Sequence, residues 1–292
     1  MVKKMIILNE KEYAEECLKN KFIGDKPFYT LSVLGKYYYH CLGYRKKKIV
    51  ELLTEFISST YPMYECNKIS WDESIDKISS KAGKYTLHEI DGVWITENEL
   101  ATIDNINSKV LRRLAFTLLC LAKLANIKNP KNSGWVNNDT KEIFKLARIS
   151  CSVVDRDMYL CELQSLSLIE FPRKLDNLSC RIKYIDEDND KVLFISDFRE
   201  LGYEYLKYCG ENLTRCCECG ILFKNNKYGN KKYCKDCSGY TPQKTKTVKC
   251  IDCGTEFEVS SLNTKTTRCE CCKREYRRNY QKELMRKIRK MG

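Results

Sequence analysis

The sequence predicts a mostly α-helical protein with small β elements, in which two larger domains precede two small cysteine-rich modules. Apolar residues recur at helical spacing through much of residues 1–165, and short alternating segments follow between residues 166 and 195. Ten of the 18 cysteines crowd into residues 216–272. A chain of 292 residues is long enough for several domains. The expected domains are 1–108, 109–210, 211–240 and 241–292.

Residues 1–108 are expected to form a helical domain. Pro27 is expected to end the first helix, because proline lacks the amide hydrogen that a helix interior needs. Thr30 is expected to cap the next helix, which ends near Gly43. Apolar residues at helical spacing predict a further amphipathic helix over Lys46–Ser58.

Residues 109–210 predict a second domain in which helices come first and short strands follow. We expect helices at 109–125, 140–147, 152–165 and 197–208, and strands at 181–185 and 192–195. Residues 166–172 are expected to be a helix end that runs into a further strand. Asp139 is placed to cap the second of these helices. Ahead of this domain, Thr96 and Glu99 have the spacing of a capping box, which predicts another short helix.

Two short helices joined by a turn and followed by a hairpin are the order of a winged helix-turn-helix domain. The run from Leu160 to Glu170 resembles the point in that family where the recognition helix ends and the chain enters the wing. This resemblance covers most of residues 109–210 and implies contact with DNA. The wing would supply four basic residues, which are Arg173, Lys174, Arg181 and Lys183.

The predicted recognition helix is an acidic surface, since it carries Asp155, Asp157 and Glu162. Carboxylates repel the phosphate backbone, so this surface does not favour DNA. Winged helices also serve as protein-interaction modules. Both a DNA contact and a protein contact therefore stay open for this domain.

The C-terminal part contains an internal repeat. Cys-x-x-Cys-Gly-x-x-Phe begins at Cys216 and again at Cys250, an offset of 34, and a second Cys-x-x-Cys begins at Cys234 and again at Cys269, an offset of 35. A loop insertion of one residue explains the slip. The repeat predicts two sets of four ligands, Cys216, Cys219, Cys234 and Cys237 for one ion and Cys250, Cys253, Cys269 and Cys272 for the other.

The spacing of these cysteines indicates structural zinc. Two cysteines three residues apart in a tight turn direct both sulfurs to one ion, and two such turns complete a tetrahedral site with Zn–S distances of about 2.3 Å. An iron–sulfur or redox dithiol centre is the competing interpretation. The phase of Gly220 and Gly254 leaves Cys217 and Cys271 as spare thiols, with an exchange of ligands as the alternative. We expect two Zn²⁺ ions.

The second copy resembles treble-clef zinc fingers, because no glycine or proline occurs from Glu270 to Lys290 and its last ligand pair would begin a helix. In the first copy, the stretch from Lys231 to Cys237 resembles the second knuckle of the same family. The C-terminal region as a whole resembles tandem four-cysteine zinc-ribbon or treble-clef fingers. The resemblance implies a small fold held by zinc and no single activity. Treble-clef nucleases need a histidine in the finger, and this chain has only His40 and His88. Four-cysteine zinc leaves no open position for water, so a non-enzyme is expected.

Positive charge is concentrated in the same part of the chain. From Cys216 onward there are 19 Lys and Arg against 8 Asp and Glu, a net charge of +11, whereas the preceding 215 residues carry a net charge of +2. Two Zn(Cys)₄ sites of charge about −2 each lower the first figure to about +7. The last helix then supplies the attraction for nucleic acid, through Lys273, Arg274, Arg277, Arg278, Lys282 and Arg286.

These features predict a zinc-containing nucleic-acid-binding protein, with DNA ahead of RNA, acting as a regulator or replication accessory factor. The richness in Lys, Asn, Ile and Cys resembles phage and prophage proteins of AT-rich Gram-positive bacteria. The alternative is an adaptor or inhibitor that docks on a host enzyme. No apolar stretch is long enough for a membrane span and no signal peptide is found, so a cytoplasmic protein without a membrane partner is expected.

Overall fold

The computed structural model describes residues 6–172, 179–225, 228–239, 245–260 and 266–291. The chain divides into two compact units, Met1–Lys232 and Tyr233–Gly292. Helices predominate, and the strands form small antiparallel sheets, as the sequence predicts. Within the described ranges, no helix combines the length and hydrophobicity that a bilayer span requires.

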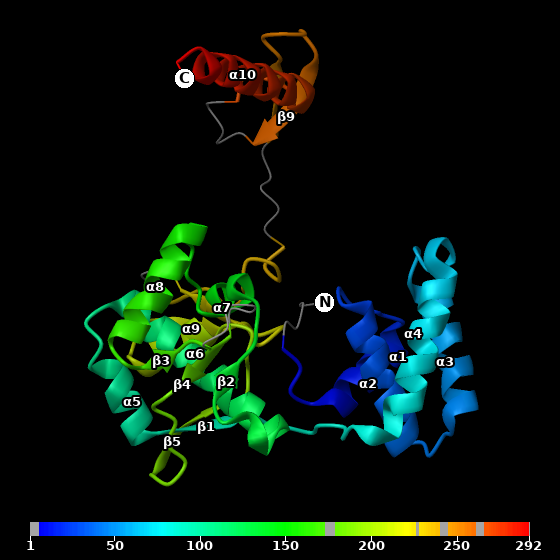
Figure 1. The fold of residues 1–292 in the computed structure, drawn as a ribbon. Helices are drawn as coiled ribbons and strands as arrows, with labels where there is room; N and C mark the ends of the chain where they lie inside the picture. The colour runs from blue at the N-terminus through cyan, green and yellow to red at the C-terminus, as the bar shows by residue number, and fades with distance from the viewer. Residues whose placement is uncertain (1–5, 173–178, 226–227, 240–244, 261–265, 292) are drawn as a thin grey trace. The chain divides into compact units, whose positions relative to one another are not determined.

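The first core of the larger unit is helical (Figure 1). Its elements are α1 (Glu10–Asn20), α2 (Pro27–His40), α3 (Lys46–Thr60), the 3₁₀ turn η1 (Glu65–Asn67), α4 (Lys68–Lys81) and η2 (Ala82–Lys84). Helix α2 packs against α1, α3 and α4. The fully buried side chains include Leu31, Leu34, Leu53 and Ile75, which lie on the inward faces of α2, α3 and α4. Burial of this apolar surface stabilises a bundle whose helices alone are short.

The start of α2 differs from the expectation. The helix begins at Pro27, and Thr30 lies inside its first turn. The Thr30 hydroxyl donates to the carbonyl of Ile23 at 2.6 Å and is buried, so Thr30 is not the cap. Proline suits this first position because its missing N–H is one that a helix start leaves unpaired. Gly43, with φ of +70°, follows the end of the helix as expected.

The second core is built around the long helix α6. Its elements are β1 (Val93–Thr96), α5 (Glu97–Asp104), α6 (Lys109–Lys128), η3 (Pro130–Asn132), β2 (Trp135–Val136), α7 (Thr140–Leu146), α8 (Val153–Ser165), β3 (Ile169–Glu170), β4 (Cys180–Ile182), β5 (Lys191–Ile195) and α9 (Leu201–Tyr208). One antiparallel sheet has the order β2–β4–β3, and β1 pairs with β5. The two cores divide between Ala82 and Ile90, ahead of residue 108, because β1 and α5 pack on α6.

Local sequence signals set the helix starts in this core. Thr96 and Glu99 form the predicted capping box of α5, and the Asp139 carboxylate accepts from two amides at the start of α7. Ser152 and Asp155 form a second capping box, at α8. The wing residues Arg173 and Lys174 lie outside the described residues.

A buried ion pair joins three segments of the second core. The Glu99 carboxylate is fully buried and accepts from Lys123 Nζ at 2.7 and 2.9 Å. It also accepts from the backbone amides of Thr96 at 2.8 Å and Asp186 at 2.9 Å. This carboxylate therefore holds α5, α6 and the turn before β5 together.

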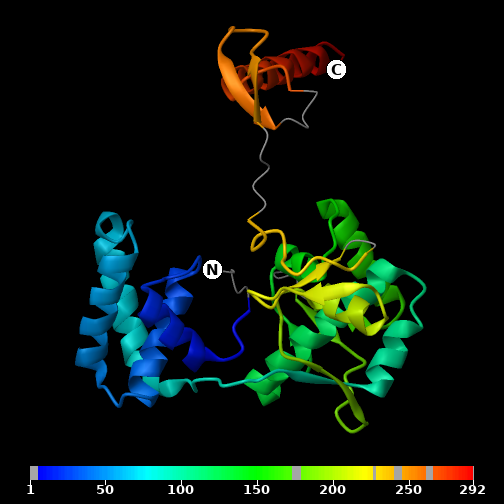
Figure 2. The same ribbon diagram turned by 180° about the vertical axis from the view of Figure 1, so that it is seen from behind.

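The C-terminal part is made of two hairpins and a long helix. Strand β6 (Leu213–Arg215) pairs with β7 (Leu222–Lys224), next to a small apolar cluster that α9 shares. In the smaller unit β8 (Thr245–Lys249) pairs with β9 (Glu256–Ser260), and α10 (Glu270–Met291) follows. Figure 2 shows the β8–β9 hairpin lying against the start of α10.

Candidate metal centres and basic helix

Eight cysteines come together in two groups of four. The first group is Cys216, Cys219, Cys234 and Cys237, and the second is Cys250, Cys253, Cys269 and Cys272. The four sulfur atoms of each group lie within 4.8 Å of one another. These are the two sets that the repeat predicts, and each group could hold a metal ion.

The backbone of the first turn is the same in both groups. Cys216 and Cys250 each accept from the glycine amide four residues on, at 2.9 Å in both copies. Their own amides donate to the carbonyls of Ile221 and Thr255, at 2.9 and 3.0 Å. Both glycines have φ of +70°, a conformation that favours glycine because it lacks Cβ.

The slip of one residue between the copies also appears in the hydrogen bonds. The Cys217 amide donates to the carbonyl of Lys232, and the Ile251 amide donates to that of Thr267, both at 3.0 Å. The acceptors lie 35 residues apart and the donors 34. Each acceptor precedes the third cysteine by two residues, so one insertion separates two copies of one hydrogen-bond framework.

One sulfur–sulfur distance in the second group matches a tetrahedral site. Cys253 Sγ lies 3.7 Å from Cys269 Sγ. A four-thiolate zinc site with Zn–S of about 2.3 Å requires sulfur–sulfur separations of about 3.8 Å. This distance and the four-cysteine donor set are compatible with zinc.

Hydrogen bonds polarise the sulfurs of the second group unequally. The backbone amide of Cys269 donates to Cys250 Sγ at 3.3 Å and, with other backbone amides, lowers the pKa of Cys250 to about 6. The hydroxyl of Thr255 lowers the pKa of Cys253. Hydrogen bonds with the neighbouring thiols Cys253 and Cys269 raise the pKa of Cys272 well above its usual value. A divalent cation is what would allow all four to be thiolates.

The spare cysteines lie outside both groups. Cys217 and Cys271 are exposed, and neither belongs to a group of metal-ligating side chains in the part of the chain that the structure describes. This placement agrees with the phase of the repeat.

An arginine of the larger unit supports the first group, and the sequence pattern does not reveal it. Arg199 Nη1 donates to the carbonyl of Cys219 at 2.8 Å. The same guanidinium binds both oxygens of Asp197, with Nε at 2.9 and 3.0 Å and Nη2 at 2.6 Å. Burial would raise the pKa of Asp197, but the hydrogen bonds from Arg199 lower it. Arg199 thus fixes the turn that carries the second ligand.

An arginine supports the second group in a comparable way. Arg268 Nε lies 2.7 Å from Asp252 Oδ2. In the sequence, Asp252 lies between Cys250 and Cys253, the first two cysteines of that group. The Arg268 guanidinium carbon lies 4.3 Å from the ring centroid of Tyr276, on the second turn of α10. This contact joins the first ligand pair to the helix that carries the second pair.

The described part of α10 presents its cations to solvent. Arg274, Arg277, Arg278 and Lys282 are exposed, and Lys273 is half-buried. None of these five pairs with a carboxylate among the described residues. Tyr276 and Tyr280 are 53% and 58% exposed beside them. Arg286 lies in the helix, and its side chain is outside the described residues.

The other predicted nucleic-acid residues are separate from α10 in the chain. Arg181 is exposed on β4, but its guanidinium already has partners within the protein. Nη1 lies 3.1 Å from Glu170 Oε1, and Nε donates to the Ser133 carbonyl at 2.9 Å. Lys183 is exposed just after the same strand.

The exposed face of α8 is apolar as well as acidic. Val153, Val154 and Met158 are 66%, 68% and 59% exposed, and Asp157 and Glu162 are exposed beside them. Large exposed apolar side chains gathered on one helix are typical of an interaction surface.

Comparison of the chain with protein-family models, with curated proteins and with solved structures gave no match. The chemistry of the sites therefore carries the functional argument.

Proposed function

We propose that this is a zinc-containing nucleic-acid-binding protein in which α10 is the main contact surface, with DNA ahead of RNA as the ligand. The observation that carries the proposal is the exposed cationic surface of α10, formed by Arg274, Arg277, Arg278 and Lys282, which have no carboxylate partner among the described residues. A regulator or replication accessory factor fits this role.

The spacing of these cations suits a phosphate track. Residues three and four apart lie on one side of a helix, so Arg274, Arg278 and Lys282 follow one another along it, and Arg277 lies next to them. Tyr276 and Tyr280 offer exposed rings that could stack on bases of a single strand. Phosphate contacts position a protein on nucleic acid without reading its sequence.

The metal sites serve this surface as supports. When bound, zinc would neutralise thiolate charge and tie each finger together. Cys269 and Cys272 flank the start of α10, so the second group would fix where the basic helix begins. Four cysteine ligands leave no open coordination position, which supports a structural role and a protein that is not an enzyme.

We also propose that residues 109–210 form a winged-helix-like domain. The order α6, β2, α7, α8, β3, β4 and the sheet order β2–β4–β3 support it. In that arrangement α8 would take the position of the recognition helix. The exposed surface of α8 is apolar and acidic, so it favours a protein partner that presents an apolar patch surrounded by basic residues. Docking of such a protein on α8 is the second candidate function.

The test of the main proposal is a salt series with the full chain. Binding to duplex DNA, single-stranded DNA and structured RNA is measured for the wild type and for a variant with Arg274, Arg277, Arg278 and Lys282 changed to Gln. Each phosphate contact contributes about 0.9 to the slope of log K against log salt, so the variant slope should be shallower by about 3 to 4 on duplex DNA.

The matched control changes Arg45, Lys46, Lys47 and Lys48 to Gln, which removes the same charge from exposed positions at the start of α3. Its slope should stay close to that of the wild type. Equal losses in the two variants would show that net charge alone drives binding, and would contradict a role for α10.

A second experiment decides between the two uses of α8. Replacing Asp157 with Asn and Glu162 with Gln removes two carboxylates from its exposed face. If α8 lay against DNA, affinity at low salt would rise severalfold, since repulsion is relieved. The protein-docking proposal expects unchanged DNA affinity.

A further inference from the structure

Tyrosine and basic side chains share one face of α10. Four residues stand at positions i, i+3, i+4 and i+7, the spacing that places side chains one above another along a helix. They are Lys273, Tyr276, Arg277 and Tyr280, and together they are called the tyrosine stripe. A stripe with this spacing usually packs its side chains into a core. Here Tyr276 and Tyr280 are 53% and 58% exposed and Arg277 is exposed beside them, so the stripe is available to a ligand.

The two rings of the stripe are held differently. The guanidinium of Arg268 lies over Tyr276, 4.3 Å from the ring centroid, and Asp252 holds that guanidinium at 2.7 Å. This contact fixes the Tyr276 ring before a ligand arrives, which lowers the entropy cost of binding. Tyr280 lies one turn further along α10, and its side chain forms no hydrogen bond or ring contact among the described residues. Its ring is therefore free to contact a ligand.

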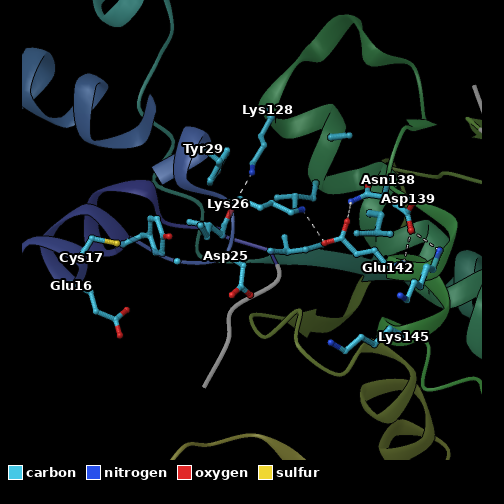
Figure 3. A pocket seen from close by; sticks show the side chains of 18 of the residues that line it. Glu16, Cys17, Asp25, Lys26, Tyr29, Lys128, Asn138, Asp139, Glu142 and Lys145 are labelled. Atoms are coloured by element: carbon cyan, nitrogen blue, oxygen red, sulfur yellow. Dashed lines mark hydrogen bonds and ion pairs between the residues drawn. The ribbon is translucent and has the colours of Figure 1, made fainter. Parts of the chain in front are cut away.

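The charge around the stripe differs from that around the cavity beside α1 and α7. Four lysines and four acids line that cavity, so its charges balance. Figure 3 shows Lys26 extending toward Glu142, whose Oε1 lies 3.6 Å from Lys26 Nζ. On α10, Lys273 and Arg277 have no carboxylate partner within the part of the chain that the structure describes. A polyanion is therefore favoured on α10, where the exposed rings also lie.

We propose that the tyrosine stripe binds single-stranded nucleic acid, with bases stacked on Tyr276 and Tyr280 and phosphates beside Arg277. The inference rests on the proposed function of α10 and specifies the form of nucleic acid that it takes. In a duplex each base is covered by its neighbours, and only its edges can be reached from the grooves. A single strand can turn its bases outward, where aromatic side chains stack on them.

Rings and cations would contribute to binding in ways that can be told apart. A phosphate contact releases counterions, so it steepens the dependence of affinity on salt. A stacked base releases none, so its loss lowers affinity at every salt concentration and leaves the slope unchanged. Removal of one stacking ring should weaken binding by about 5- to 140-fold.

The test measures the fluorescence anisotropy of labelled oligothymidylate, titrated with the full chain across a salt series. Tyr280→Leu should bind this strand about 5- to 140-fold more weakly than the wild type, with the same salt slope. Tyr280→Phe keeps the ring and should bind as the wild type does. Tyr276→Leu should also weaken binding, and circular dichroism checks that each variant is folded. On a duplex of the same strand with oligoadenylate, Tyr280→Leu should match the wild type.

Two controls separate stacking from other effects. A strand of abasic residues keeps the phosphates and lacks the bases, so the wild type and Tyr280→Leu should bind it equally. Tyr85→Leu removes a ring that is 60% exposed in the first core and should leave binding to oligothymidylate unchanged. A parallel series with oligouridylate shows which of the two strands binds more tightly, and the loss in Tyr280→Leu is expected on that strand.

The outcomes distinguish this inference from the function on which it rests. The stacking inference is overturned if Tyr280→Leu binds the single strand as tightly as the wild type, or if it loses as much affinity for the abasic strand and the duplex. In either case the cations of α10 would still account for binding. If the wild type binds none of these ligands at low salt, the proposed nucleic-acid function itself fails.

Discussion

Replacing Arg199 with Met should weaken the first metal site and leave the second unchanged. In the structure the Arg199 guanidinium donates to the Cys219 carbonyl at 2.8 Å and is itself held by Asp197 at 2.6 to 3.0 Å. The side chain is largely buried, with 18% of its surface exposed. Solvent therefore screens the contact little, and its loss frees the turn that carries one ligand.

The expected size follows from the contact that is lost. A hydrogen bond from a charged donor contributes about 1.5 to 3 kcal/mol, and each 1.4 kcal/mol is a factor of about ten. The zinc affinity of the first site should therefore fall about 10- to 100-fold, which is also the usual cost of losing a residue that orients a metal ligand.

The assay is competition for zinc with the chromophoric chelator 4-(2-pyridylazo)resorcinol. Two release steps are expected for the wild type. Arg199→Met should shift one step, and the matched variant Arg268→Met should shift the other, because Arg268 supports the second group through Asp252 and Tyr276. If both ions leave Arg199→Met with wild-type affinity, the argument that this arginine orients the site is wrong.

Two further predictions concern stability. Lys123→Met should lower the unfolding free energy by about 3 to 5 kcal/mol, since it leaves the buried Glu99 carboxylate without its cation. The control Lys77→Met breaks an exposed pair with Glu73 at 3.8 Å and should lower the unfolding free energy by less than about 1 kcal/mol. Urea unfolding followed by tryptophan fluorescence measures both, and equal costs would contradict the burial argument. Burial raises the pKa of Glu200 to about 7 against the attraction of Arg148. The folded state then binds more protons than the unfolded state between the usual glutamate pKa and about 7, so this group's contribution to stability should fall as pH rises through that window. Glu200→Gln should flatten that part of the stability profile, and an unchanged slope would assign the pH dependence to other groups.

The sequence predicts best those features that a few neighbouring residues determine. The capping box of Thr96 and Glu99 and the Asp139 cap are local, and both are confirmed. The grouping of the eight cysteines into two sets of four is confirmed as well, because a repeat with a fixed glycine specifies which thiols face one another. The prediction that Thr30 caps the second helix was wrong for a local reason as well, since that helix already begins at Pro27.

Features that depend on distant partners were missed. Strand β1 exists because it pairs with β5, which lies nearly a hundred residues later, and the short alternation of Val93–Thr96 alone does not indicate a strand. This pairing moves the division between the two cores ahead of residue 108. Arg199 could not be assigned to Cys219 from spacing, because their contact arises only when α9 packs beside the first hairpin.

The metal content of the intact chain, measured by native mass spectrometry, tests the two proposed zinc sites most directly. Two zinc ions per chain are expected for the wild type, and also two for a variant with Cys217 and Cys271 both changed to Ser. A Cys272→Ser variant should retain one. Any other number in the wild type, or a mass that corresponds to iron and sulfide, would contradict two four-cysteine zinc sites.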